Sequence, residues 1–177
     1  TLVTGPTDLD PPNDIDIVPV ASGREMHEAV MMRADEVDMI CKAAAVCDWR
    51  PRDASRTKLR KEEMEAEIEL VRNPDILSEL GERFGPNSGD GEEGPLLVGF
   101  AAETDDLVDK GRDKLRRKGA HLIVANRIGG DDSAFGADAV EAHLLTRENV
   151  TSYGPISKED LAAEIWKRAL ELDEARA

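Results

Sequence analysis

The sequence predicts an α/β fold in which helices cover both faces of a mostly parallel sheet. Short β-branched apolar runs alternate with amphipathic stretches along all 177 residues, and each crossover between parallel strands requires a helix-sized connection. Helix start signals fall between the apolar runs, where such crossovers would begin. We therefore expect a three-layer, Rossmann-like arrangement, and the length fits one domain over residues 1–177.

The elements follow from periodicity and from these start signals. Ser22 with Glu25 resembles a capping box, Asn73-Pro74 offers an N-cap followed by proline at the first helical position, and Ser157 begins the last helix. We expect helices at 23–36, 74–84, 105–119 and 157–174. We expect strands at 2–4, 15–20, 38–46, 66–72, 96–101, 121–125 and 140–145, with 149–153 pairing with the last of these.

The charge of the chain argues against a nucleic-acid partner. Asp and Glu number 38 against 23 Lys and Arg, a formal net charge of −15, whereas a phosphate ladder needs a basic face. A surface this acidic suits a halophilic organism, because salt in the interior of the cell screens the self-repulsion. Unfolding at low salt and recovery in molar salt would support this hypothesis.

A cytoplasmic location is expected. The sequence has no apolar run of the roughly 20 residues that a membrane helix needs, and its N-terminus does not resemble a secretory signal. Cys41 and Cys47 are the two cysteines, and both lie in one apolar run, which does not resemble a disulfide framework. We therefore expect no membrane partner.

Ligands of open α/β sheets bind beyond the carboxyl ends of the strands. The sequence contains neither the glycine pattern of a standard dinucleotide binder nor a P-loop lysine motif. His27, His121 and His143 are scattered, so we expect no metal site made by protein ligands alone. The segments that follow the predicted strands are therefore the places to search for chemistry.

Small residues follow the strand predicted at 38–46. Ala43 and Ala44 would let a flat ligand approach the backbone, and Asp48 lies at the strand end. A carboxylate there can accept hydrogen bonds from ribose hydroxyls or hold a metal-bound water. The alternative is an aspartate that caps a turn.

A cluster of cations comes next, in Lys58-Leu59-Arg60-Lys61. On an acidic chain these side chains could close over a triphosphate. The alternative is a solvated loop.

The strand predicted at 66–72 turns directly into a helix through Asn73, Pro74, Asp75, Ile76 and Leu77. The backbone N–H groups and the positive dipole end of such a helix can receive phosphate oxygens. An ordinary capped helix start would look the same.

Two further signals involve an aromatic ring and a lysine pair. Phe100 ends the strand predicted at 96–101 and could stack on a nucleobase, although such a ring can equally pack in the core. Lys114 and Lys118 share a helix face at four-residue spacing. They could bind an anion, or they could pair with Asp106, Asp109 or Asp113.

In this order the motifs resemble those of the phosphopantothenate–cysteine ligase family. The resemblance rests on Ala-Ala-Val-x-Asp-Trp-Arg, a lysine pair, Asn-Pro-Asp-Ile, Gly-Phe-Ala-Ala-Glu-Thr, Lys-x-x-x-Lys and the Ala125-Asn126 strand end. It covers nearly the whole chain, beginning with the opening Thr-Leu-Val-Thr-Gly-Pro-Thr.

The resemblance implies a reaction in two steps. The carboxylate of 4′-phosphopantothenate attacks the α-phosphorus of CTP with Mg²⁺, and the amine of cysteine then displaces CMP from the acyl-cytidylate. It also implies a homodimer. In bacteria and archaea the ligase is commonly fused to a flavin-dependent decarboxylase half, so FMN would belong to that half and not to this chain.

Carried over to this sequence, the resemblance assigns nucleotide contacts to a set of residues. Lys58 would act on the phosphates and Asp48 on the ribose or the Mg²⁺ shell, which makes these two the candidate catalytic residues. Phe100 would lie against the nucleoside. The full set is Ala43, Ala44, Asp48, Lys58, Pro74, Asp75, Ile76, Leu77, Phe100, Lys114 and Lys118.

Two departures from the family pattern affect these expectations. The family's first strand and a Gly/Ser-rich segment with an asparagine would precede Thr1, so the chain alone is expected to turn over poorly. Many relatives also place an asparagine where Ala139 or Val140 stands, which could mark an archaeal type. Which residues bind the acyl substrate stays open.

Two other functions fit parts of the pattern. A transferase that uses a nucleotide sugar would share the strand-end aspartate and the stacking ring, but it would not need Lys58, Lys114 and Lys118 together. A nucleotide-binding module without turnover is the second alternative. The choice of CTP over ATP comes from the resemblance alone, because a ring stacks on either base.

Overall fold

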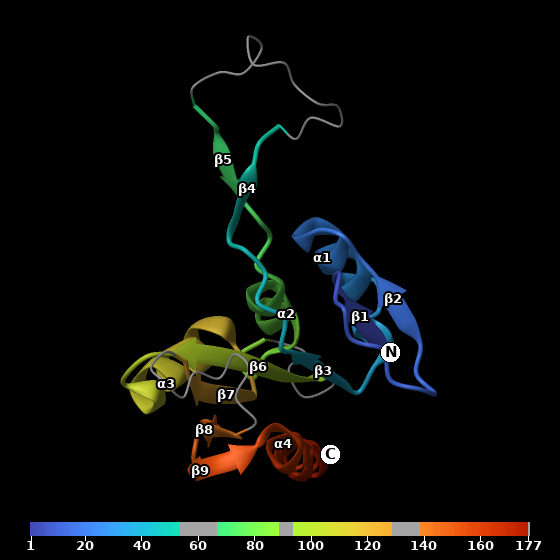
Figure 1. The fold of residues 1–177 in the computed structure, drawn as a ribbon. Helices are drawn as coiled ribbons and strands as arrows, with labels where there is room; N and C mark the ends of the chain where they lie inside the picture. Colours follow the sequence, from blue (N-terminus) through green and yellow to red (C-terminus); the bar gives the residue numbers. More distant parts are fainter. Residues whose placement is uncertain (54–66, 89–93, 129–138, 177) are drawn as a thin grey trace. The chain divides into compact units, whose positions relative to one another are not determined.

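The computed structural model describes residues 1–53, 67–88, 94–128 and 139–176 (Figure 1). The chain forms two compact units. Unit 1 comprises Thr1–Val30 and Ala44–Asp75, and unit 2 comprises Met31–Ala43 and Ile76–Ala177. The single ligase domain expected from the sequence stays a prediction. No helix within the described ranges is long and apolar enough to cross a membrane.

Unit 1 contains a parallel strand pair, a helix and an antiparallel hairpin. Strands β1 (Leu2–Thr4) and β2 (Ile17–Pro19) run parallel, and helix α1 (Gly23–Met31) follows. One half of the predicted capping box is confirmed, because Ser22 Oγ accepts the Glu25 N–H at 3.2 Å; Glu25 itself accepts the Ala21 N–H at 2.7 Å, one residue before the cap. Strands β4 (Trp49–Pro51) and β5 (Leu70–Arg72) form the hairpin.

Unit 2 is built on a five-stranded sheet in the order β3-β6-β7-β8-β9. The pairs β3–β6 and β6–β7 are parallel, whereas β7–β8 and β8–β9 are antiparallel. Its strands are β3 (Met39–Lys42), β6 (Leu96–Glu103), β7 (Leu122–Arg127), β8 (Ala139–Leu145) and β9 (Val150–Ser157). Its helices are α2 (Ile76–Phe84), α3 (Leu107–Lys118), α4 (Lys158–Glu174) and a short 3₁₀ turn, η1 (Ala34–Glu36).

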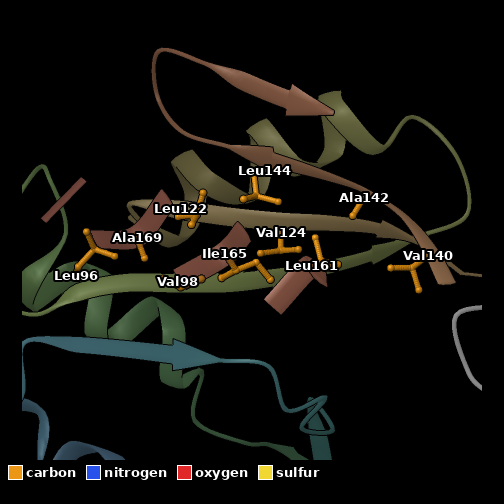
Figure 2. Close-up of a cluster of buried hydrophobic side chains, with 10 residues drawn as sticks. All are labelled: Leu96, Val98, Leu122, Val124, Val140, Ala142, Leu144, Leu161, Ile165 and Ala169. Atoms are coloured by element: carbon orange, nitrogen blue, oxygen red, sulfur yellow. The ribbon is translucent and has the colours of Figure 1, made fainter. Parts of the chain in front are cut away.

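The sheet of unit 2 is covered on both faces, which confirms the predicted α/β class. On one face Leu161, Ile165 and Ala169 of α4 pack against side chains of β6, β7 and β8 (Figure 2). On the other face α2 and α3 contribute Leu77, Leu107 and Leu115 to a second apolar cluster. Leu96, Leu97 and Val98, three successive residues of β6, therefore have no exposed surface, as burial on both faces of a parallel strand requires.

Several predicted boundaries were wrong. The helix predicted at 23–36 ends at Met31 and is followed by η1, and the strand predicted at 38–46 ends at Lys42. Strand β4 was not predicted, and its partner β5 lies in the hairpin of unit 1 instead of in the five-stranded sheet.

The start of α2 was also misplaced, because Asn73 has other partners. Its side-chain nitrogen donates to the Cys47 carbonyl at 2.8 Å, and its side-chain oxygen accepts from Arg50 Nη1 at 3.2 Å. Both ends of the amide are thus engaged with the segment around β4. The helix begins at Ile76, not at Pro74.

His121, which precedes β7, is expected to reduce stability in mild acid. Its Nδ1 accepts the Leu97 N–H at 2.9 Å, so the neutral ring is the form that fits. Burial, with smaller contributions from Arg176 and Arg147, lowers the pKa of His121 to about 4 from 6.5. The unfolded chain therefore binds more protons between these pH values, and stability falls as pH drops through this window, by roughly 3 kcal/mol at most.

Urea unfolding at a series of pH values between 7 and 4 checks this prediction. The His121→Gln variant should show a flatter dependence of the unfolding free energy on pH than the wild type. Gly154→Ala, which removes no titratable group and places its Cβ with nothing within 4 Å, is the control and should keep the wild-type slope. Equal slopes for the wild type and His121→Gln would contradict the prediction.

Candidate functional site

The carboxyl ends of β3 and β6 lie side by side in unit 2. Lys42 is paired with Gly99, so Ala43 follows β3 next to the position of Phe100 on β6. The Phe100 ring is half-buried and packs against the apolar cluster shared with α4. Of the two alternatives for Phe100, this contact favours core packing, and its place against a nucleoside stays a prediction.

The first turn of α2 lies on the opposite face of the sheet. Ile76 is 2% exposed and Leu77 is 3% exposed, so neither side chain is available to a ligand. Leu77 packs directly over β6: a Cβ atom on Gly99 would lie 2.5 Å from Leu77 Cδ2. Any contact from these residues would therefore come from their backbone N–H groups, at the positive end of the helix dipole.

Helix α3 brings Lys118 to this turn. The Lys118 ammonium donates to Ser78 Oγ of α2 at 3.0 Å, and both side chains are partly buried. Lys114 is half-buried and lies one turn earlier on α3. The structure thus brings Lys118 to the first turn of α2.

Two acidic residues near α3 pair with cations other than Lys114 and Lys118. Asp105 forms an ion pair with Lys110, and Asp113 lies 3.7 Å from Arg116. The Lys110 ammonium holds the pKa of Asp105 below its usual range. The Lys118 ammonium also bonds to Ser78 of another helix, and the pairing of Lys114 and Lys118 with Asp106 or Asp109 stays a prediction.

The remaining predicted residues of the described chain lie in unit 1. Ala44 and Asp48 are exposed, and the Asp48 carbonyl accepts the Asn73 N–H at 2.8 Å. Pro74 is half-buried and Asp75 is exposed. The main-chain bond from Asn73 ties the segment before β4 to the segment after β5, so these two stretches are held together within unit 1.

Of two further features singled out in the sequence, one lies outside the described residues and one within them. Lys58, with the whole Lys58–Lys61 cluster, belongs to the stretch that the structure does not describe. Of the pair that departs from the family pattern, Ala139 is exposed at the start of β8, whereas Val140 is buried in the cluster that packs on α4.

Sequence reasoning missed Ser78 and Arg50. Arg50 Nη1 donates to Asn73 Oδ1 and to the Arg72 carbonyl, which fixes the turn after β5. Ser78 is the partner of Lys118. Spacing along one helix shows which residues share a face, but it does not show which other helix that face meets.

Comparison with known proteins gives three results. The family model described as the DNA/pantothenate metabolism flavoprotein C-terminal domain matches residues 1–172. The chain is 37% identical over 166 residues to the Coenzyme A biosynthesis bifunctional protein CoaBC of Bacillus subtilis, covering 93% of this chain and 39% of that protein. The Haemophilus influenzae protein of the same name is 33% identical over 171 residues, covering 97% of this chain and 41% of that protein.

The fold agrees with these sequence matches. The crystal structure of the C-terminal domain of Coenzyme A biosynthesis bifunctional protein CoaBC is similar at a TM-score of 0.74 and 33% identity, covering 97% of this chain and 74% of that chain. The chain thus spans about two fifths of the length of the two curated relatives and corresponds to the C-terminal domain of CoaBC. The chain belongs to the DNA/pantothenate metabolism flavoprotein C-terminal domain family.

Proposed function

We propose that this chain is the ligase part of a coenzyme A biosynthesis protein and joins 4′-phosphopantothenate to cysteine through an acyl-cytidylate formed from CTP. The proposal is supported by the names of the relatives and by the resemblance to the ligase family. The observation that carries it is the contact of Lys118 with the first turn of α2. This contact places an ammonium group beside the positive end of a helix dipole, on a protein whose net charge is −15.

The chemistry explains why such charge is needed. A carboxylate of the acid forms a bond to the α-phosphorus of CTP while the bond to pyrophosphate breaks. The cysteine amine then attacks the acyl carbon, CMP leaves with the bonding electron pair, and the amine loses a proton. The first step brings an anion to a polyanion, so cations and N–H donors lower its barrier.

The residues of this chain fit separate parts of that task. Lys114, Lys118 and the backbone N–H groups at the start of α2 would bind phosphate oxygens. Lys58 would neutralise charge as the acyl-cytidylate forms. Mg²⁺ is usually held by phosphate oxygens and one or two carboxylates, and the exposed carboxylate of Asp48 fits this donor set. When bound, the ion would polarise the phosphoryl group.

Further parts of the proposal concern the whole protein. The decarboxylase half, with its FMN, would belong to the same polypeptide, since the relatives are named bifunctional and are longer than this chain. We also propose that the protein acts in the cytoplasm as a homodimer. A monomer mass by light scattering at assay concentration would contradict the dimer.

Pyrophosphate release from CTP and Mg²⁺ tests the ligase chemistry. We expect release only when 4′-phosphopantothenate is present, and CMP with the ligated product once cysteine is added. This chain should be assayed beside a version extended at its N-terminus, with ATP as the alternative nucleotide. Folded protein that binds CTP but releases no pyrophosphate in either version would favour a binding module, and release that does not depend on the acid would favour another reaction.

A further inference from the structure

Ser78 makes a contact that joins two helices of unit 2. Its hydroxyl oxygen accepts a hydrogen bond from the Lys118 ammonium at 3.0 Å. Ser78 is the third residue of α2, and Lys118 is the last residue of α3. The bond therefore connects the beginning of one helix with the end of the other.

The backbones of the two helices are in direct contact close to this bond. A Cβ atom on Gly81 would lie only 1.8 Å from the Lys118 carbonyl oxygen. Gly119, whose φ of 58° is favourable only for a few residue types, ends α3 and lies against Gly81. The main chain of Lys118 is thus fixed relative to α2. The Ser78 hydroxyl in turn holds the ammonium at the tip of the Lys118 side chain.

We propose that Ser78 is a positioning residue, which holds the Lys118 ammonium beside the first turn of α2 so that it can receive the phosphates of the nucleotide. The inference rests on the proposed nucleotide-dependent function. It goes beyond that function by giving a task to a residue that the resemblance to the ligase family does not assign.

Physical chemistry explains why Lys118 needs such a partner. A lysine side chain is long and flexible, and it loses much rotamer freedom when its ammonium is fixed in one place. Lys114 lies one turn away on the same face, and two ammonium groups at this spacing repel each other. Ser78 orders Lys118 before the nucleotide binds, and this preorganisation increases affinity.

Calorimetric titration of CTP with Mg²⁺ tests the proposal, using the wild type, Ser78→Ala, Ser78→Thr, Lys118→Gln and the double variant Ser78→Ala/Lys118→Gln. Ser78→Ala should weaken binding about threefold to tenfold, because a hydrogen bond to a charged group is lost. Ser78→Thr, which keeps the hydroxyl, should restore binding. In the Lys118→Gln background the serine substitution should add less than a twofold loss, because both changes remove the same interaction.

Ser152→Ala is the matched control. Ser152 Oγ lies 2.8 Å from His143 Nδ1 on the β8–β9 pair, so this change also removes one serine hydrogen bond from unit 2. It should leave CTP binding unchanged. In steady-state assays Ser78→Ala should raise the KM for CTP and leave kcat within about twofold, a pattern that a loss of folded protein would not produce.

The outcomes separate the inference from the proposed function. Wild-type affinity in Ser78→Ala, with binding weakened in Lys118→Gln, would overturn the inference alone. A serine effect that persists undiminished in the Lys118→Gln background would also overturn it, because Ser78 would then act by another route. If the folded wild type binds no CTP, the inference fails together with the nucleotide site on which it rests.

Discussion

Replacing Gly81 with alanine is expected to lower the free energy of unfolding by about 3 kcal/mol and to abolish tight CTP binding. The added Cβ would lie 1.8 Å from the Lys118 carbonyl oxygen, 2.8 Å from its carbonyl carbon and 3.1 Å from Gly119 Cα. All three are backbone atoms, which cannot rotate out of the way. Helix α2 or α3 would have to move, and the contact between Ser78 and Lys118 would be lost.

The intrinsic preference of alanine for helices acts in the opposite direction. Alanine is favoured over glycine in a helix interior by about 1 kcal/mol. If Gly81 had no close neighbours, its replacement by alanine would therefore stabilise the protein. The distance of 1.8 Å from the added Cβ to the Lys118 carbonyl oxygen is far shorter than the 3.0 Å below which real Cβ contacts essentially never fall. Overpacking of this kind outweighs the helix propensity of alanine. The expected net sign is therefore destabilising.

Urea unfolding followed by circular dichroism measures this effect. Gly154→Ala is the control, because nothing lies within 4 Å of the Cβ position there. It should stay within about 0.5 kcal/mol of the wild type. If Gly81→Ala were as stable as the wild type, α2 and α3 could not be packed as closely as the structure shows.

The parts of the fold that the sequence predicted are those decided by local pattern. The run that forms β6 is apolar at successive positions because both faces of that strand are buried, and the prediction of a strand there was correct. Ser157 caps the start of the last helix, as the sequence indicated, and its hydroxyl accepts the Asp160 N–H at 3.0 Å. Both signals are complete within a few residues of sequence.

The parts that failed depend on partners far away in the sequence. Strand β4 has only three residues and includes Pro51, so no alternation of apolar and polar residues could indicate it. It is stabilised by pairing with β5. The Arg72 guanidinium also lies over the Trp49 ring, 5.0 Å from the ring centroid. The start of α2 was misplaced because the Asn73 amide bonds across 26 residues to the Cys47 carbonyl. Local propensity contains no information on either contact.

The candidate site shows the same division. Four-residue spacing correctly placed Lys114 and Lys118 on one helix, but Ser78 came from the packing of α2 on α3. For Phe100 the sequence left base stacking and core packing open, and the structure favours core packing, because the ring packs against the cluster that contains Val98 and residues of α4. The roles of the candidate residues in nucleotide binding stay predictions, as does every expectation for Lys58.

Replacing Lys58 with glutamine is expected to reduce pyrophosphate release by about 100-fold or more. Glutamine keeps a hydrogen-bonding side chain but removes the charge, and a preorganised group that stabilises developing charge commonly contributes two to three orders of magnitude in rate. The expectation follows from the proposed first step, in which a carboxylate approaches a triphosphate. The chain has 38 Asp and Glu against 23 Lys and Arg, so each cation near the triphosphate counts.

The prediction is specific to the chemical step, so binding and turnover must be measured separately. Lys58→Gln should weaken CTP binding by much less than it slows release, because the lysine acts mainly on the charge that develops during the reaction. Lys158→Gln is the control, since Lys158 is exposed at the start of α4 and should be replaceable without effect. Full activity in Lys58→Gln would mean that the Lys58–Lys61 cluster is a solvated loop. Charge neutralisation would then have to come from Mg²⁺, Lys114, Lys118 and the first turn of α2.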